Sequence, residues 1–304
     1  MASHSRLKKA KTHSKTHLTD YVPSNGFQTI LDDIVSLRIQ GASALEKAAL
    51  DALAREAIKV SAKDRDYFVA TIRSLSGQLV ATRPTEPELQ SALHQVVLVT
   101  AHQSNGIKAK QALLDFIHQF EDGRSRALTK IAREGVHLFS KPSVVLTHCH
   151  SHSALEIIKL AHENGKIRHV YCTESRPLFQ GRKTAQDLVD WKIPCTQIVD
   201  DAIRSLLSQQ KINVFLTGAD AIIPQGLINK VGTSTISMAC REYKVPHIVA
   251  ASSLKFVKKI EIEERSADEV WSERPRALSI YNPAFDLTPR KWLKGIITEN
   301  GLKH

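Results

Sequence analysis

The sequence SVVLTHCHSHSALEIIKLA at residues 143–161 opens the stretch that decides the fold. VYCTESRPLFQGRKTAQDL at 170–188 and INVFLTGADAIIPQGLINKVGT at 212–233 continue it. Each segment begins with a short, β-branched apolar run and passes through small or polar residues into a helical pattern. This order is typical of a β-strand followed by an α-helix.

The second part of the chain is predicted to be an α/β domain. Its predicted strands are residues 144–147, 169–173, 196–199, 213–216, 247–250 and 295–298. Helical patterns separate most of them, as expected for a Rossmann-like, doubly wound and mainly parallel sheet with right-handed crossovers. Residues 255–275 are charged and irregular, and are interpreted as an excursion or an oligomer contact.

The part before the sheet is predicted to be all-helical. Helical apolar periodicity begins at residue 27, with Ile30, Ile34, Leu37 and Val35 expected on one face. It breaks at Gly41 and at residues 82–85 and continues to residue 139, with a further break expected near Gly123. Pro84 disfavours helix at Arg83, which is expected on a non-helical turn. The domains are therefore predicted as a basic tail and linker (1–24), a helical domain (25–140) and the Rossmann-like domain (141–304).

Composition indicates an ordinary globular protein. The 304 residues are 42% hydrophobic and 24% charged. The sequence has no apolar run of membrane-span length and no apolar signal core, so a cytoplasmic location is expected. The four cysteines form no CxxC pair, which argues against a zinc site or a disulfide framework. Cys172, Cys195 and Cys240 are expected to be small buried hydrophobes.

The net charge of +11 is unevenly distributed. Residues 4–17, HSRLKKAKTHSKTH, are rich in Lys and Arg and contain no acid. This tail is interpreted as a solvated disordered segment, with a nucleic-acid or ribosome contact as the alternative.

Three polar residues follow successive predicted strands: Cys149, Arg176 and Asp220. Because parallel α/β sheets bind ligands at the carboxyl ends of their strands, these residues are candidates for chemistry. The turn THCHSHS precedes a helix whose N-terminus would bind phosphate and lower the pKa of the Cys149 thiol. His148, His150 and His152 would add to that positive field. The alternatives are a buried structural thiol or, less favoured without a nearby carboxylate, a metal site.

The other two strand ends are also rich in ligand-binding side chains. TESRPLFQGRKTA at 173–185 is interpreted as a binding loop, in which Arg176 and Lys183 suit a phosphate, the alternative being a solvated face. Asp220 precedes Asn229 and Lys230, which come just before another helix; helix capping is the alternative role for Asp220. Neither a P-loop nor a GxGxxG motif is present.

Together, these blocks resemble one superfamily over residues 30–301, and TRPT (82–85) and NPAFDLTP (282–289) extend the likeness. The superfamily includes methylthioribose-1-phosphate isomerase, ribose-1,5-bisphosphate isomerase, and the alpha, beta and delta regulatory subunits of eukaryotic translation initiation factor 2B. THCHS, INK, the lysine of SSLKF and NPAFDLTP look most like ribose-1,5-bisphosphate isomerase.

This resemblance implies an aldose–ketose isomerase that converts ribose 1,5-bisphosphate to ribulose 1,5-bisphosphate without a metal or redox cofactor. The implied catalytic pair is Cys149 and Asp220. The chain departs from the isomerase pattern at Gln40 and His152, where the isomerase carries cations. Substrate binding is assigned, from the resemblance and from the binding loop, to Gly41, Ala42, Arg83, Ser151, Ser153, Arg176, Gln180, Lys183, Asn229, Lys230 and Lys255.

Two other functions stay open within the same resemblance. One is a noncatalytic regulatory subunit of the initiation factor 2B alpha type, which binds a phosphorylated metabolite or nucleotide. The third-ranked function is methylthioribose-1-phosphate isomerase. The resemblance also implies a homodimer or homohexamer, and AMP as an activator that would link the enzyme to AMP metabolism.

Overall fold

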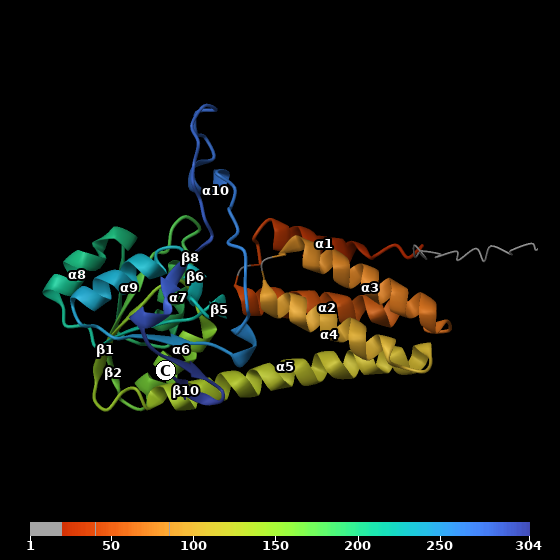
Figure 1. Cartoon of the computed structure of the whole chain (residues 1–304), viewed down its shortest axis with the longest axis horizontal. Helices are drawn as coiled ribbons and strands as arrows, with labels where there is room; N and C mark the ends of the chain where they lie inside the picture. The colour runs from red at the N-terminus through yellow and green to blue at the C-terminus, as the bar shows by residue number, and fades with distance from the viewer. Residues whose placement is uncertain (1–19, 40, 85) are drawn as a thin grey trace, which may run out of the picture.

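The computed structural model describes residues 20–39, 41–84 and 86–304. Its first part is helical and its second part is built on a mostly parallel sheet, which confirms the predicted fold class (Figure 1). The predictions for the basic tail and for Gln40 lie outside the described residues. The helices of the first part are α1 (Asn25–Val35), α2 (Ala42–Lys59), α3 (Arg65–Thr82), α4 (Pro87–Ala101) and α5 (Gly106–Val136).

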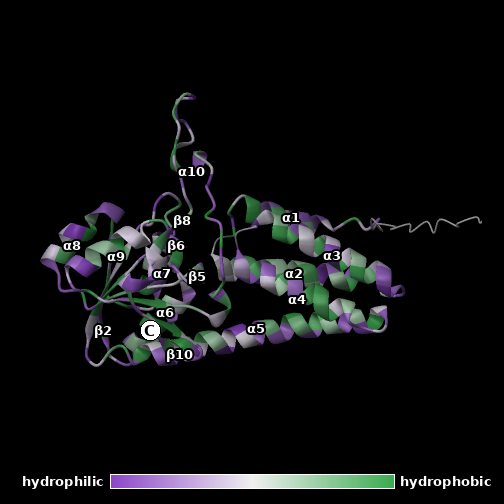
Figure 2. Cartoon of the chain, in the orientation of Figure 1, coloured by the Kyte–Doolittle hydropathy of each residue, from purple (hydrophilic) through white to green (hydrophobic). Residues whose placement is uncertain are grey.

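The helical part has its own apolar core. Figure 2 shows apolar positions along each of these helices with polar positions between them. Phe68, Leu53 and Leu93 are fully buried where α2, α3 and α4 meet. In α1 the buried residues are Phe27, Leu31 and Ile34, and Ile30 packs against the same core, which agrees with the predicted face at Ile30 and Ile34, whereas Val35 is 60% exposed. Arg83 follows α3 in a non-helical conformation, as predicted.

Helix α5 connects the two cores. The break expected near Gly123 was wrong, because the helix runs without interruption from Gly106 to Val136. Its first half contributes Leu113 and Ile117 to the core of the helical part, and its last turns contribute Ile131 to the core under the sheet. Figure 1 shows α5 running beneath both parts. We retain the domain division at residues 140 and 141 as a proposal, with α5 shared between the two cores.

The main sheet has seven strands among the described residues, in the order β10-β9-β7-β4-β1-β2-β3. All pairs are parallel except β10 with β9. Every strand predicted from the sequence is present, and only β10 was missed. The strands are β1 (Ser143–Thr147), β2 (Ile167–Thr173), β3 (Cys195–Ile198), β4 (Val214–Thr217), β7 (His247–Ala250), β9 (Leu293–Thr298) and β10 (Gly301–Lys303).

Helices cover both faces of this sheet. Val145 of β1 faces the end of α5, α6 (His152–Glu163) and α7 (Gly181–Asp190), whereas Val144 and Leu146 face α8 (Ile203–Gln209) and α9 (Thr233–Glu242). Alternate residues of a strand point to opposite faces, so both faces need apolar residues, and the run SVVLT supplies them. Cys172 and Cys240 are buried in these cores as predicted, but Cys195 is only partly buried.

A second, antiparallel sheet was not predicted. It consists of β5 (Ala221–Ile223), β6 (Gly226–Lys230) and β8 (Phe285–Pro289). Its strands β5 and β6 lie in the segment around Asp220, Asn229 and Lys230, and β8 lies in the NPAFDLTP motif. The sheet places Asn229 and Lys230 at the end of β6, directly before the turn into α9.

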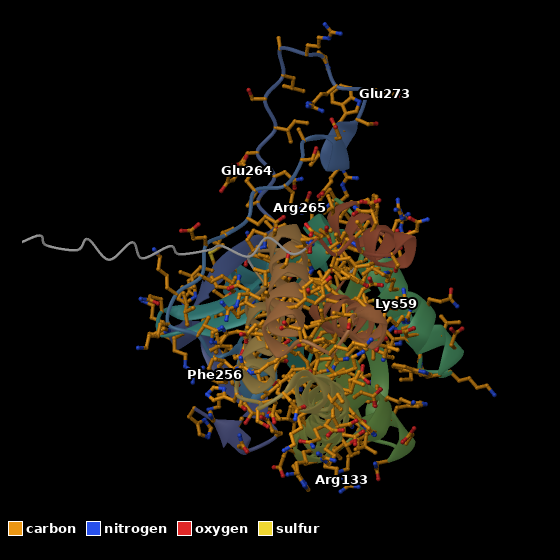
Figure 3. All side chains as sticks on the ribbon, turned by 90° about the vertical axis from the view of Figure 1, so that its right-hand side faces the viewer. Lys59, Arg133, Phe256, Glu264, Arg265 and Glu273 are labelled. Atoms are coloured by element: carbon orange, nitrogen blue, oxygen red, sulfur yellow. The ribbon has the colours of Figure 1, made fainter. Side chains whose placement is uncertain are left out.

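Residues 258–282, called the arm below, project from the body of the molecule (Figures 1 and 3). The arm contains the short helix α10 (Asp268–Trp271), and its two strands meet where Arg265 N donates to Asn282 O at 2.8 Å. Figure 3 shows Arg265 near the body and Glu273 toward the far end. The excursion expected near residues 255–275 is therefore observed. None of the described helices combines the length and apolarity needed to cross a bilayer.

Candidate active site

A cavity lies at the carboxyl ends of β1 and β4, between the sheet and the helical part. The space inside it and at its mouth, open solvent included, is about 1080 Å³. The catalytic residues proposed from the sequence, Cys149 and Asp220, both line it. The other predicted site residues that line it are Gly41, Arg83, Ser151, Ser153, Gln180, Lys183, Asn229, Lys230 and Lys255.

One predicted site residue, Arg176, is not brought to this cavity. Arg176 is exposed and does not line it, because its guanidinium turns toward the arm and donates to Val270 O at 3.3 Å. Its backbone N–H donates to Asp200 Oδ2 at 2.7 Å, which anchors the loop after β2. Ala42 begins α2, but its side chain is outside what the structure describes.

Cys149 is held in an unusual backbone conformation. Its φ of 65° lies in the left-handed region, which is uncommon for a residue with a side chain. The conformation is fixed from both sides, because Cys149 N donates to Ser175 Oγ at 2.8 Å and Thr184 Oγ1 donates to Cys149 O at 2.8 Å. Strained backbone of this kind is concentrated at functional sites.

The expected thiolate at Cys149 is not found. Burial raises the pKa of the Cys149 thiol to about 11, although the nearby Lys230 charge opposes this shift. Helix α6 begins at His152, three residues beyond the thiol, with the Ser151 side chain as its N-cap. The thiol is therefore protonated near neutral pH.

The three histidines of the turn are uncharged near neutral pH. Burial lowers the pKa of His148 and of His150 to about 4 and also lowers the pKa of His152. The expectation that they add positive charge was wrong. His148 instead has a structural role: Nδ1 contacts Thr173 Oγ1 at 2.6 Å, and Nε2 donates to Val231 O at 3.0 Å.

Asp220 follows β4, and its backbone N–H donates to Ile228 O at 3.0 Å, which joins the main sheet to β6. Burial raises the pKa of the Asp220 carboxyl, against the charges of Lys255, Lys230 and Arg83. Asp220 is thus suited to bind and release a proton inside the cavity.

Glu86 is a site residue that the sequence analysis missed. It lines the cavity, is 5% exposed, and pairs with Arg83 Nη2 through Oε1 at 3.0 Å. Burial and then the charge of Asp220 raise the pKa of Glu86 to about 7, against Arg83. The available signal was its position between Pro84 and Pro87, in the turn expected to present Arg83. Glu86 thus binds and releases a proton near neutral pH, and its charge is coupled to that of Asp220.

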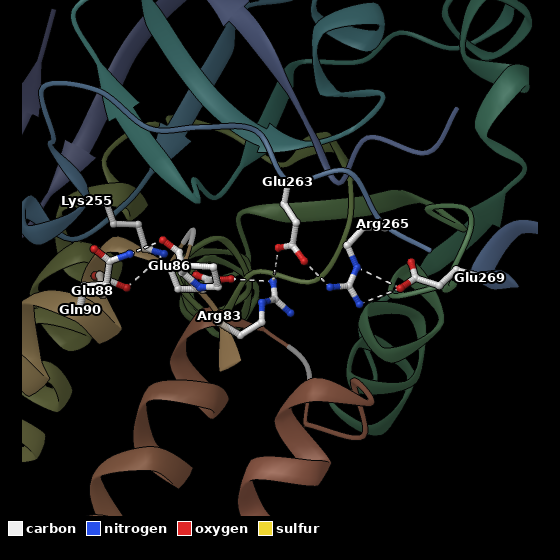
Figure 4. A network of polar contacts seen from close by, with 9 residues as sticks. Arg83, Glu86, Glu88, Gln90, Lys255, Glu263, Arg265 and Glu269 are labelled. Atoms are coloured by element: carbon white, nitrogen blue, oxygen red, sulfur yellow. Dashed lines mark hydrogen bonds and ion pairs between the residues drawn. The ribbon is translucent and has the colours of Figure 1, made fainter. Parts of the chain in front are cut away.

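Further ion pairs surround Glu86 (Figure 4). Lys255 Nζ lies 3.1 Å from Glu88 Oε2, and Arg83 Nη2 lies 3.4 Å from Glu263 Oε2. Arg265 of the arm pairs with both Glu263 and Glu269. Arg265 and Glu269 also line the cavity and were not predicted. The network therefore connects the helical part, the cavity and the foot of the arm.

The raised pKa of Glu86 predicts a pH-dependent stability. The folded state binds this proton more tightly than the unfolded chain, whose pKa is the usual 4.5, so the stabilisation is complete below about pH 4.5 and is lost as the pH rises through 7. Relative to Glu86→Gln, the wild type should lose about 2 to 3 kcal/mol of unfolding free energy between pH 5 and 8. Urea unfolding at both pH values measures this difference. The exposed Glu242→Gln is the control, and parallel pH curves for wild type and Glu86→Gln would contradict the prediction.

Together, the fold and the cavity define an α/β protein whose cavity holds buried carboxyl groups and a thiol beside lysine and arginine side chains. The chain belongs to the initiation factor 2 subunit family, whose profile it matches over residues 38–304. This confirms the family resemblance inferred from the motifs.

Several members of the family are similar over most of their length. The chain is 36% identical over 280 residues to a ribose 1,5-bisphosphate isomerase of Methanocaldococcus jannaschii, covering 89% of each chain. It is 33% identical over 306 residues to a methylthioribose-1-phosphate isomerase of Desulforamulus reducens, covering 93% of this chain and 88% of the relative. These relatives support the assignment of this chain as an enzyme, an isomerase.

The fold is shared with a translation factor as well. The structure of translation initiation factor eIF-2B, subunit delta, from Archaeoglobus fulgidus superposes with a TM-score of 0.77 at 27% identity, covering 91% of this chain and 87% of that chain.

Proposed function

We propose that the chain isomerises a pentose 1-phosphate from the aldose to the ketose form, with Cys149 and Asp220 as the catalytic pair. The observation that carries this proposal is their position in one cavity beside cations available for phosphate. Among the described residues, Lys183 and Lys230 line this cavity and have no ion-pair partner. A phosphate is the ligand that such cations favour.

The reaction requires four proton movements and no redox partner. Protonated Asp220 donates to the ring oxygen as the bond from that oxygen to C1 breaks. The Cys149 thiolate removes the proton on C2, and the C1–C2 double bond forms. Asp220 then takes the proton of the C2 hydroxyl while Cys149 returns a proton to C1, which leaves a carbonyl at C2. Lys230 lowers the pKa of Cys149 and stabilises the thiolate that this sequence needs.

Two substrates are candidates on this proposal. Ribose 1,5-bisphosphate is the substrate in the name of the Methanocaldococcus relative, and the motifs THCHS and INK favour it. Methylthioribose 1-phosphate is the substrate in the name of the Desulforamulus relative. Both are pentose 1-phosphates, so the same proton transfers apply to both.

Proton NMR of the purified chain with each sugar phosphate tests the proposal. We expect loss of the anomeric C1–H signal and growth of a C1 methylene signal for at least one substrate. The assay is repeated with added AMP, because we propose AMP as an activator, and the subunit number is measured by light scattering, because we propose a homo-oligomer. Tight binding of the sugar phosphates without any turnover would overturn the isomerase and support a regulatory subunit.

A further inference from the structure

The cations of the cavity fall into two groups that differ in their partners. The charge of Lys183 acts on His150 and His152, and that of Lys230 acts on Cys149. At the other end, Arg83 is paired with Glu86 and Glu263, and Lys255 is paired with Glu88. Asp220 interacts with both groups, because the charges of Lys255, Lys230 and Arg83 all act on its carboxyl.

In the second group, the charges of Arg83 and Lys255 are already balanced by carboxylates. Glu86 and Glu88 are 5% and 6% exposed, so their carboxylates have little water to replace a lost cation. A phosphate that paired with Lys255 would either leave the Glu88 carboxylate without its cation or share Lys255 with that carboxylate. Breaking a buried ion pair in this way is strongly unfavourable, and like charges side by side in a desolvated site are unfavourable too.

This end is nevertheless suited to hydroxyl groups. Among the described residues, the buried Nε of Arg83 has no acceptor, so a donor is left for a ligand oxygen. The carboxylate oxygens of Glu86 accept hydrogen bonds, and Glu86 lines the cavity. A sugar hydroxyl both donates and accepts, so it satisfies these groups without adding charge.

We propose that Glu86 and Glu88 are specificity-determining residues that restrict the cavity to a sugar with a single phosphate. The phosphate lies at the Lys183 and Lys230 end, and uncharged groups of the sugar lie against Arg83, Glu86 and Lys255. This inference rests on the proposed function for the identity of the ligand as a pentose 1-phosphate. It selects, within that function, substrates whose C5 carries no phosphate.

Ribose 1-phosphate and ribose 1,5-bisphosphate test this proposal, because they differ only in the phosphate on C5. Calorimetric titration of Cys149→Ser measures binding of both ligands without turnover. We expect the monophosphate to bind at least about tenfold more tightly. Like-charge contact in a desolvated site costs more free energy than a tenfold difference in affinity corresponds to. In the same background, Glu88→Gln should shift the affinity ratio toward the bisphosphate by about tenfold or more. Glu121→Gln removes a carboxylate that pairs with Lys47 outside the cavity, and it should leave the ratio unchanged.

The outcomes separate this inference from the proposed function. Tighter binding of the bisphosphate to the unchanged cavity would overturn the inference, whether or not either sugar is isomerised, and so would an unchanged ratio in a folded Glu88→Gln. If Glu88→Gln does not fold, the ratio of the two ligand affinities measured with Cys149→Ser alone decides whether the inference stands. Preferential binding of the monophosphate without turnover in the wild type would overturn the isomerase and leave the specificity inference standing. Failure of both ligands to bind would overturn both.

Discussion

Replacing Cys149 by Ser is expected to lower kcat by about 10²–10⁴-fold, the contribution usual for a positioned acid–base group. A serine hydroxyl has nearly the same size but holds its proton far more tightly, so it cannot remove the proton on C2. Asp220→Asn should have an effect of similar size, because the amide neither donates nor accepts the protons of the sugar oxygens. Steady-state assays with the better pentose 1-phosphate measure both variants.

The control for this prediction is Cys195→Ser, because Cys195 is a partly buried thiol on β3 that does not line the cavity. It should retain wild-type kcat. Circular dichroism and ligand binding confirm that Cys149→Ser and Asp220→Asn are folded. Retention of more than about a tenth of wild-type kcat in a folded Cys149→Ser would be incompatible with a role in acid–base chemistry.

The raised pKa of Cys149 gives the same prediction a pH signature. With a thiol pKa of about 11, the reactive thiolate is a small fraction that grows with pH. Wild-type kcat/KM should therefore rise about tenfold per pH unit between pH 7 and 9. A flat profile over this range would show that the free enzyme does not use a Cys149 thiolate as its base.

The strands of the main sheet could be predicted because most of them carry a continuous apolar run, which is typical of strands buried on both faces and not of exposed loops. SVVLT is buried along its whole length, and the turn after it places Cys149 at the sheet edge, as expected for parallel strands. The strands β5, β6 and β8 were missed because they are short and are bounded by Pro or Gly. Gly123 was misjudged because packing at both ends of α5 outweighs the low helix propensity of one glycine.

The site residues were predictable where a strand end fixes them and unpredictable where a tertiary contact does. Cys149 and Asp220 follow strands, so their convergence could be inferred. Arg83 and Glu86 are three residues apart, so their pairing is local, but the burial of Glu86 and the contact of Arg83 with Glu263 of the arm depend on the tertiary fold. The Cys149 thiol stays protonated because its burial and the nearby Asp220 charge raise its pKa, and together they outweigh the Lys230 charge and the helix effect expected from the sequence.

Gly181→Ala is expected to destabilise the protein strongly. A Cβ at this position would lie 1.7 Å from Thr173 O and 2.9 Å from Glu174 C, both atoms of the backbone at the end of β2. Gly181 N also donates to Glu174 O at 3.1 Å, so α7 begins in direct contact with that strand. Because no flexible side chain is involved, either the strand end or α7 must move.

This displacement should lower the free energy of unfolding by about 3 kcal/mol, the upper range for overpacking. It should also weaken phosphate binding, because Gln180 and Lys183 flank the same turn and line the cavity. Urea unfolding and titration with ribose 1-phosphate measure the two effects. Gly123→Ala is the matched control: no atom lies within 4 Å of its added Cβ, so inside α5 it should stabilise by about 0.5–1 kcal/mol. Equal stability of Gly181→Ala and the wild type would mean that α7 does not press against β2 as described, and that Gln180 and Lys183 are not positioned by that contact.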